Sequence, residues 1–245
     1  MWQPVHDELD RWRDLGLAVE LWLRDDDAVE PTPALDRLIA LTAEFAIPVA
    51  LAIIPARSGP ALAVRLVAAP HVHPVIHGWS HANHAPPPEK KQELGPHRPR
   101  AVILDDLRVG LARLSGLYGE RLAPMLVPPW NRIDPALLDD LPSLGFAALS
   151  AFGRKLRSLP GLAIVNTHVD IIDSHAGNAC RDHAWLIAAL ARELAEARIA
   201  GGRPIGILSH HLVSDDAAFR FLRDLFTAAP PARVRWRAPG ELLAT

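Results

Sequence analysis

Three adjacent carboxylates, Asp25, Asp26 and Asp27, follow an apolar run that ends at Leu23. Carboxylates this close repel one another, and burying them without a cation is costly. Because neighbouring residues at a strand end point to opposite sides, one carboxylate could bind a metal while the next faces a water molecule. The alternative is a capping cluster for the helix expected from Pro33, since acidic groups are favoured near a helix N-terminus.

Two histidines, His77 and His81, are four residues apart and follow another apolar run. If this segment turns helically, both imidazoles lie on one face and could bind one Zn²⁺ ion. With one carboxylate they would form a three-ligand site with an open position for water, which is typical of catalytic zinc. The alternative is a pair of loop histidines, but together with the acidic cluster the pair favours a divalent metal, with Zn²⁺ as the expected ion.

Polar residues follow three further apolar runs. They are Trp130, Asn131 and Arg132 after 125–127, His168, Asp170 and Asp173 after 163–167, and His210 and His211 after 204–208. His210 suits a proton donor beside a metal, although a core histidine bonded to backbone is the alternative. His211 has the opposite orientation and is predicted to be structural. Trp79 and Trp130 could stack on a sugar, while core packing competes for Trp79.

Short apolar runs alternate with longer amphipathic patterns throughout the chain. The expected strands are 19–23, 48–54, 72–76, 125–127, 146–150, 163–167, 204–208 and 234–236, and the expected helices are 33–45, 59–69, 102–118, 135–144, 181–200 and 217–228. This alternation predicts an α/β protein with a parallel sheet inside and helices outside, in a single domain spanning 1–245. Seven or eight such units favour a barrel, whose C-terminal rim would collect the polar residues.

The composition agrees with a folded, water-soluble chain. Its 245 residues carry 26 Lys plus Arg against 28 Asp plus Glu, and 49% are hydrophobic. This near-neutral balance argues against a nucleic-acid partner, and a solvated loop explains the adjacent Lys90 and Lys91. The Pro-rich segment 85–100 either covers the site or is a disordered surface insertion.

Nothing in the sequence predicts export or membrane insertion. The first 20 residues lack the apolar core of a signal peptide, and the longest apolar runs are too short to span a bilayer. The lone Cys180 excludes an internal disulfide framework. A cytoplasmic protein without a membrane partner is therefore expected, and its oligomeric state is left open.

Taken in order, these segments resemble the motifs of the polysaccharide deacetylases, carbohydrate esterase family 4, which share the NodB-homology barrel. The family's Thr-Phe-Asp-Asp-Gly motif is similar to 23–27. On that match Asp25 is the catalytic base and Asp26 a metal ligand. The His-Ser/Thr-x-x-His motif matches 77–81, which implies that His77 and His81 are the other two ligands. The resemblance implies a distorted (β/α)7-8 barrel.

Three later motifs of the family also have counterparts. Arg-x-Pro-aromatic resembles 127–130, Asp-x-x-Asp-Trp resembles 170–174, and Leu-x-His matches 208–210. The last match makes His210 the general acid. The match of the Arg-x-Pro-aromatic motif to 127–130 implies that Trp130 and the neighbouring backbone of Asn131 contact the substrate and its oxyanion, with Trp79 nearby. The fourth gives Asp170 and Asp173 orienting roles.

The sequence departs from the family pattern at the residues that surround the base. Asp27 stands where the family has glycine, Arg24 where it has phenylalanine, and Val127 where it has the third-motif arginine. Arg132 or Arg24 could therefore supply the charge that orients Asp25.

The resemblance implies hydrolysis of an N-acetyl group on a saccharide by a metal-activated water, with an aspartate base and a histidine acid. Two other functions stay open. One is a hydrolase of the same barrel acting on a non-sugar amide, such as a ureide or cyclic imide. The other is a non-catalytic carbohydrate-binding barrel, against which the presence of both an acid and a base argues.

Overall fold

A computed structural model describes residues 1–154, 156, 159–174 and 177–243. Its α-helices are α1 (Gln3–Asp14), α2 (Pro33–Glu44), α3 (Pro60–Val67), α4 (Arg100–Tyr118), α5 (Leu141–Leu144), α6 (His183–Ile199), α7 (Asp216–Ala228) and α8 (Pro239–Leu242). Its strands are β1 (Glu20–Ala28), β2 (Val49–Ile53), β3 (Val72–His77), β4 (Met125–Val127), β5 (Ala148–Leu149), β6 (Ala163–Ile164), β7 (Thr167–Asp170), β8 (Ile172–Asp173), β9 (Ala179–Cys180), β10 (Ile205–Ser209) and β11 (Arg235–Trp236).

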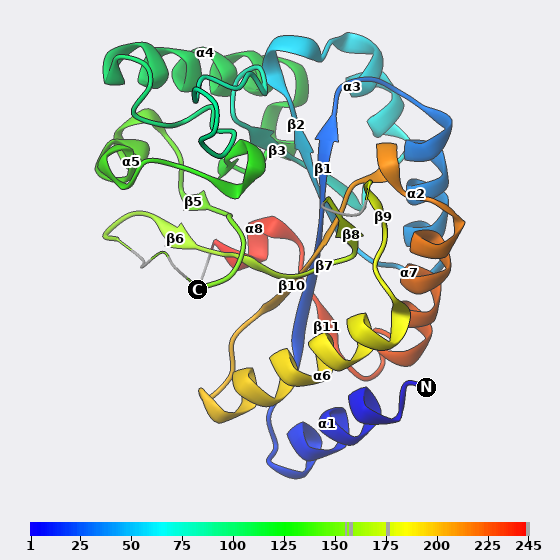
Figure 1. Ribbon diagram of the computed structural model, residues 1–245. Coiled ribbons are helices and arrows are strands. Elements are labelled where there is room, and N and C mark those ends of the chain that lie inside the picture. Colours follow the sequence, from blue (N-terminus) through cyan, green and yellow to red (C-terminus); the bar gives the residue numbers. More distant parts are fainter. Residues whose placement is uncertain (155, 157–158, 175–176, 244–245) are drawn as a thin grey trace.

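The main sheet is parallel and curls into a distorted barrel with helices around it (Figure 1). Its strand order is β6-β5-β4-β3-β2-β1-β10-β7, and β11 pairs with the start of β1. In the part of the chain described here, β6 and β7 share no ladder, and a bridge links Phe152, in the segment after β5, to Thr167 of β7. The predicted (β/α)7-8 barrel is therefore confirmed in its distorted form.

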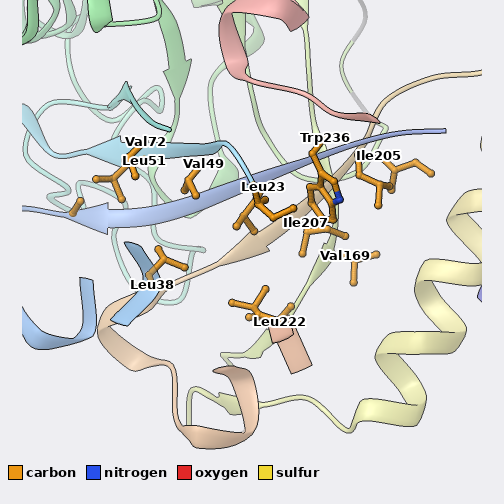
Figure 2. Close-up of a cluster of buried hydrophobic side chains, with 14 of the residues drawn as sticks. Leu23, Leu38, Val49, Leu51, Val72, Val169, Ile205, Ile207, Leu222 and Trp236 are labelled. Atoms are coloured by element: carbon orange, nitrogen blue, oxygen red, sulfur yellow. The ribbon is translucent and has the colours of Figure 1, made fainter. Parts of the chain in front are cut away.

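The two faces of the sheet carry different side chains, as strand alternation requires. Leu23, Leu51 and Ile207 point outward and pack with Leu38 of α2 and Leu222 of α7 (Figure 2). The inward face is filled by a second cluster of buried residues, which includes Trp22, Ala50, Ala52, Val75 and Val127. Arg24, two residues beyond Trp22, is also fully buried. The interior is thus a packed core up to the C-terminal strand ends.

Several features of the elements differ from the sequence-based expectation. The helix expected at 135–144 is a 3₁₀-helix over Pro135–Asp140, followed by α5. β1 was expected to end at Leu23 but continues to Ala28, so the acidic cluster lies within the strand rather than after it. The strand expected at 163–167 is divided into β6 and β7, because Asn166 turns its side chain to the backbone of Ala151 and Gly153. The small antiparallel pair β8–β9 was not expected.

The N-terminal residues form a helix rather than an irregular lead-in. α1 packs on α6, and the indole Nε1–H of Trp12 donates to the carbonyl of Leu194 at 3.0 Å (Figure 1). No helix in the described ranges is both long and apolar enough to cross a membrane. The cytoplasmic location and the single domain over 1–245 stay predictions.

Candidate active site

Asp27, His77 and His81 form one group that could hold a metal ion, with a ligand atom from each within 4.8 Å of the others. The Nε2 atoms of His77 and His81 lie 3.1 Å and 3.2 Å from Oδ1 of Asp27. The resemblance had implied Asp26 as the carboxylate of this group. The structure instead brings Asp27, the next residue, to the two imidazoles.

A bulge in β1 accounts for this one-residue difference. The pairing of β1 with β2 shifts register between Asp25 and Ala28, and Asp27 adopts φ 75°, in the left-handed region. Regular alternation would turn Asp27 away from the side that carries Arg24 and Asp26. The bulge instead lets Asp26 and Asp27 line the same pocket.

Asp26 forms a buried ion pair with Arg24, two residues earlier on the same face of β1. The Nε atom of Arg24 lies 2.9 Å from Oδ1 of Asp26, and Nη2–H donates to Oδ2 at 3.0 Å. The same guanidinium donates to the carbonyl oxygen and Oγ of Ser150, to the carbonyl of Ala151, and to Oδ1 of Asn131 at 2.6 Å. Arg24 thereby fixes the direction of the Asp26 carboxylate and ties β1 to the end of β5.

Asp25 has a different environment from the one expected of a catalytic base. Its carboxylate accepts from Oγ–H of Ser209 at 2.6 Å and from the backbone N–H of His211 at 2.9 Å, and it contacts Nδ1 of His211. Asp25 is fully buried and is not part of the pocket lining. Burial lowers the pKa of His211, but the charge and hydrogen bond of Asp25 outweigh it and raise the pKa. This pair joins β1 to the residues after β10, and the structural role expected of His211 stays a prediction.

Local hydrogen bonds orient the two imidazoles. The carbonyl of Val127 accepts from Nδ1–H of His77 at 2.9 Å, which directs Nε2 toward Asp27. Burial lowers the pKa of His77, but the hydrogen bond to Asp27 and the charges of Asp26 and Asp27 outweigh it and raise it. Burial and the neighbouring His77 lower the pKa of His81.

The segment between the two histidines is a loop, not the helical turn that would place them on one face. His77 is the last residue of β3, Gly78 has φ 56°, and His81 has φ 59°. The buried carboxylate of Glu93 accepts from the backbone N–H of Trp79 at 3.1 Å and from N–H of Ser80 at 2.7 Å. Glu93 therefore holds the turn that returns His81 to the site, a role that no sequence motif indicated.

The group opens into a pocket of about 590 Å³ at the C-terminal ends of the strands. Its lining residues are Asp26, Asp27, His77, His81, Lys90, Lys91, Trp130, Asn131, Arg132, Asp170, Ile172, Ser174, Asn178, His210 and Val213. Six non-glycine residues of the described chain have φ in the left-handed region, and five of them are in this lining. Backbone strain of this kind concentrates at functional sites, which supports the pocket as the active site.

His210 and Asp170 lie in this pocket, as expected. Nδ1 of His210 is buried and has no hydrogen-bond partner among the residues described. Burial raises the pKa of Asp170, and the charge of His210 acts in the opposite direction. The imidazole and this carboxyl group are therefore close enough to interact.

The structure separates several other expected residues from the pocket. Trp79 is not among the lining residues, and its ring atom Cε3 lies beside Gly110 of α4. Asp173 forms an ion pair with Arg181 at 3.0 Å and is also outside the lining. His168 lines a second cavity of about 610 Å³.

Trp130, Asn131 and Arg132, by contrast, do line the pocket. The Trp130 and His81 rings are 4.3 Å apart between centroids. The segment 85–100 contributes Lys90 and Lys91 to the lining, and Leu94 forms a bridge with Ile133.

Comparison with known proteins places the fold. No family model matches the sequence, and no curated protein has significant sequence similarity to it. Among solved structures, a protein assigned as a polysaccharide deacetylase from Mycobacterium smegmatis superposes with TM-score 0.68 at 15% identity, covering 93% of this chain and 89% of that chain. The peptidoglycan deacetylase PdaC from Bacillus subtilis has TM-score 0.53 at 16% identity, covering 86% and 84%.

A family 4 acetyl xylan esterase from Clostridium thermocellum, solved with a cobalt ion, has TM-score 0.52 at 16% identity, covering 92% of this chain and 90% of that chain. The protein therefore has the fold of the polysaccharide deacetylases and family 4 carbohydrate esterases. At these sequence identities the structural similarity establishes the fold alone. The function must be inferred from the residues of the pocket.

Proposed function

We propose that this protein is a metal-dependent hydrolase that removes an N-acetyl group from a saccharide. The observation that carries the proposal is the presence, in one pocket, of the Asp27–His77–His81 group, the Arg24-bound carboxylate of Asp26, and His210. The solved structures of this fold include deacetylases and an esterase, which supports the reaction class.

The donor set fits a divalent metal. Two imidazoles and one carboxylate leave an open position on a tetrahedral ion, as in catalytic zinc sites, so Zn²⁺ is the ion we propose. The bond from Nδ1–H of His77 to the Val127 carbonyl is the outer hydrogen bond that metal-ligating histidines usually make. A divalent metal held by Asp27, His77 and His81 would supply Lewis acidity toward the amide carbonyl and would acidify water.

The other residues would carry the proton transfers. Asp26, oriented by Arg24, accepts a proton from the attacking water. At the same time the oxygen of that water forms a bond to the carbonyl carbon of the acetamide. His210 donates a proton to the amide nitrogen as the C–N bond breaks, and Asp170 orients that imidazole. The products are acetate and a free amine. Trp130 forms a wall against which a sugar ring can stack.

Acetate release from N-acetylglucosamine oligomers by the zinc-loaded protein tests the function. We expect Asp26→Asn to keep one metal per chain and to lower kcat by on the order of 10²–10⁴, since a general base contributes about that much. His77→Ala should lose stoichiometric metal and with it turnover. His210→Ala should keep the metal and lose turnover.

The matched variant Asp25→Asn decides between the two assignments of the base. If Asp25→Asn abolished kcat at retained metal content and fold while Asp26→Asn stayed active, the assignment of Asp26 as base would be wrong. Absence of acetate release from every N-acetyl sugar by the metal-loaded protein would count against the deacetylase function itself.

A further inference from the structure

Three cationic side chains lie on one part of the pocket wall. Lys90, Lys91 and Arg132 all belong to the lining, and both lysines are exposed. Within the described ranges, none of the three forms an ion pair with a carboxylate. A cation that faces a binding pocket without a protein counter-charge is available to an anionic ligand.

The segment that carries the lysines is fixed to the rest of the site. Arg132 donates through Nη1 to the carbonyl of Lys91 at 2.8 Å, and N–H of Asp134 donates to the carbonyl of Leu94 at 2.7 Å. Buried Glu93 binds the turn that carries His81. The backbone that carries the two lysines is therefore fixed at the pocket before any ligand arrives, which reduces the entropic cost of binding.

The carboxylates of the pocket do not neutralise this cationic part. Asp26 is paired with Arg24, and Asp27 faces two imidazoles. Asp170 accepts from the backbone N–H of Ile172 at 3.0 Å, beyond β7. The acidic groups come from β1 and β7, whereas the cations come from the segments after β3 and β4.

We propose that the substrate bears an anionic group, a carboxylate or a phosphate, which Lys90, Lys91 and Arg132 bind while the acetamide lies at the metal-binding group. This inference rests on the proposed function and specifies its substrate class as an acidic N-acetyl amino sugar. A cavity of about 590 Å³ is within the usual size range of small-molecule sites.

Three sugars that differ only at C6 test the proposal: N-acetylglucosamine, its 6-phosphate, and the corresponding uronate. We expect the zinc-loaded protein to show a kcat/KM at least about tenfold higher for one of the anionic sugars than for the neutral one. The two anionic sugars separate phosphate from carboxylate recognition. In the double variant Lys90→Ala/Lys91→Ala this ratio should fall by about tenfold, since each exposed charge contributes a few-fold.

Two matched variants control for structural effects. Lys90→Arg/Lys91→Arg keeps the charge and should retain the preference, and Arg192→Ala removes an exposed cation from α6 outside the pocket and should leave the ratio unchanged. The preference should also weaken in about 0.5 M salt, where the Debye length is roughly half that at physiological ionic strength. Equal kcat/KM for neutral and anionic sugars, or an equal loss of both in the alanine variant, would overturn the proposal.

Calorimetric binding of the same sugars separates this inference from the function. Anion-preferring binding that the alanine variant loses, with no acetate released, would retain the anion site and reject the hydrolase. Hydrolysis or binding without charge preference would reject the anion site alone. If no sugar were bound or hydrolysed, both proposals would fail.

Discussion

Single residues in this protein have roles that depend on which side of a strand they face. The three aspartates are chemically identical but have different partners. Asp25 contacts a buried histidine, Asp26 pairs with a buried arginine, and Asp27 faces two imidazoles. Arg24 holds Asp26, the base in the proposed mechanism, in a fixed direction, because the guanidinium approaches both carboxylate oxygens. A cation beside this carboxylate is thus supplied by β1 itself.

The pH dependence of stability can be tested at a single residue, His168. Burial, and then the charge of Arg203, lowers the pKa of His168 to about 4 from 6.5. Because the unfolded chain binds the proton more tightly, the folded state should lose stability as the pH falls from 6.5 toward 4. Urea titrations at pH 7 and at pH 5 measure the unfolding free energy of the wild type and of His168→Gln. Between these two pH values we expect the unfolding free energy of the wild type to fall by on the order of 2 kcal/mol more than that of the variant. Parallel pH profiles for the two proteins would contradict the shift.

Loops, rather than the strands themselves, complete the site. β3 places His77, but His81 depends on a turn through Gly78 that Glu93 holds from 15 residues further along the chain. A Cβ at Gly78 would lie 2.1 Å from Oε2 of Glu93 and 2.6 Å from Cδ of Pro129. The position therefore requires glycine both for its φ of 56° and for space.

Gly78→Ala tests the importance of this turn. We expect a loss of at least about 2 kcal/mol of unfolding free energy from strain and overlap, together with weaker zinc binding because His81 is displaced. Gly116→Ala in α4 is the matched control. A Cβ at Gly116 meets no atom within 4 Å, so this variant should gain about 0.5–1 kcal/mol. Equal stability of the two variants in chemical denaturation would contradict this account of the turn.

Across the whole molecule, the candidate metal group connects elements that are distant in sequence. Asp27 comes from β1, His77 from β3, and His81 from the loop beyond, all at the C-terminal rim of the sheet. The core below is apolar and packs the sheet against α2 and α7 (Figure 2). A ligand that binds only this folded arrangement must stabilise the entire fold.

Metal binding should therefore raise the thermal stability of the protein. At a free zinc concentration about 100 times the Kd, linkage predicts roughly 2.7 kcal/mol of added stability. Thermal unfolding followed by circular dichroism should show a higher Tm with zinc and a return to the lower value after chelation. His77→Ala should show no such increase, and an equal increase in that variant would place the metal elsewhere.

The class of fold and the segments that supply the site can be predicted from the amino-acid sequence alone. Alternating apolar runs and amphipathic patterns suffice to predict a parallel sheet with helices outside, and the positions of His77 and His210 follow from the ends of the expected strands. Those inferences depend on local periodicity, which the sequence contains directly.

Which aspartate faces which partner depends on contacts between segments that are distant in sequence. A bulge in β1 and a left-handed Asp27 reverse the orientation that regular alternation predicts, and both arise from pairing with β2 rather than from local propensity. The same reason applies to Glu93, Lys90 and Lys91, since a Pro-rich segment without periodicity gives no indication of where it folds back. Contacts between distant segments set these positions, and no pattern in the sequence encodes them locally.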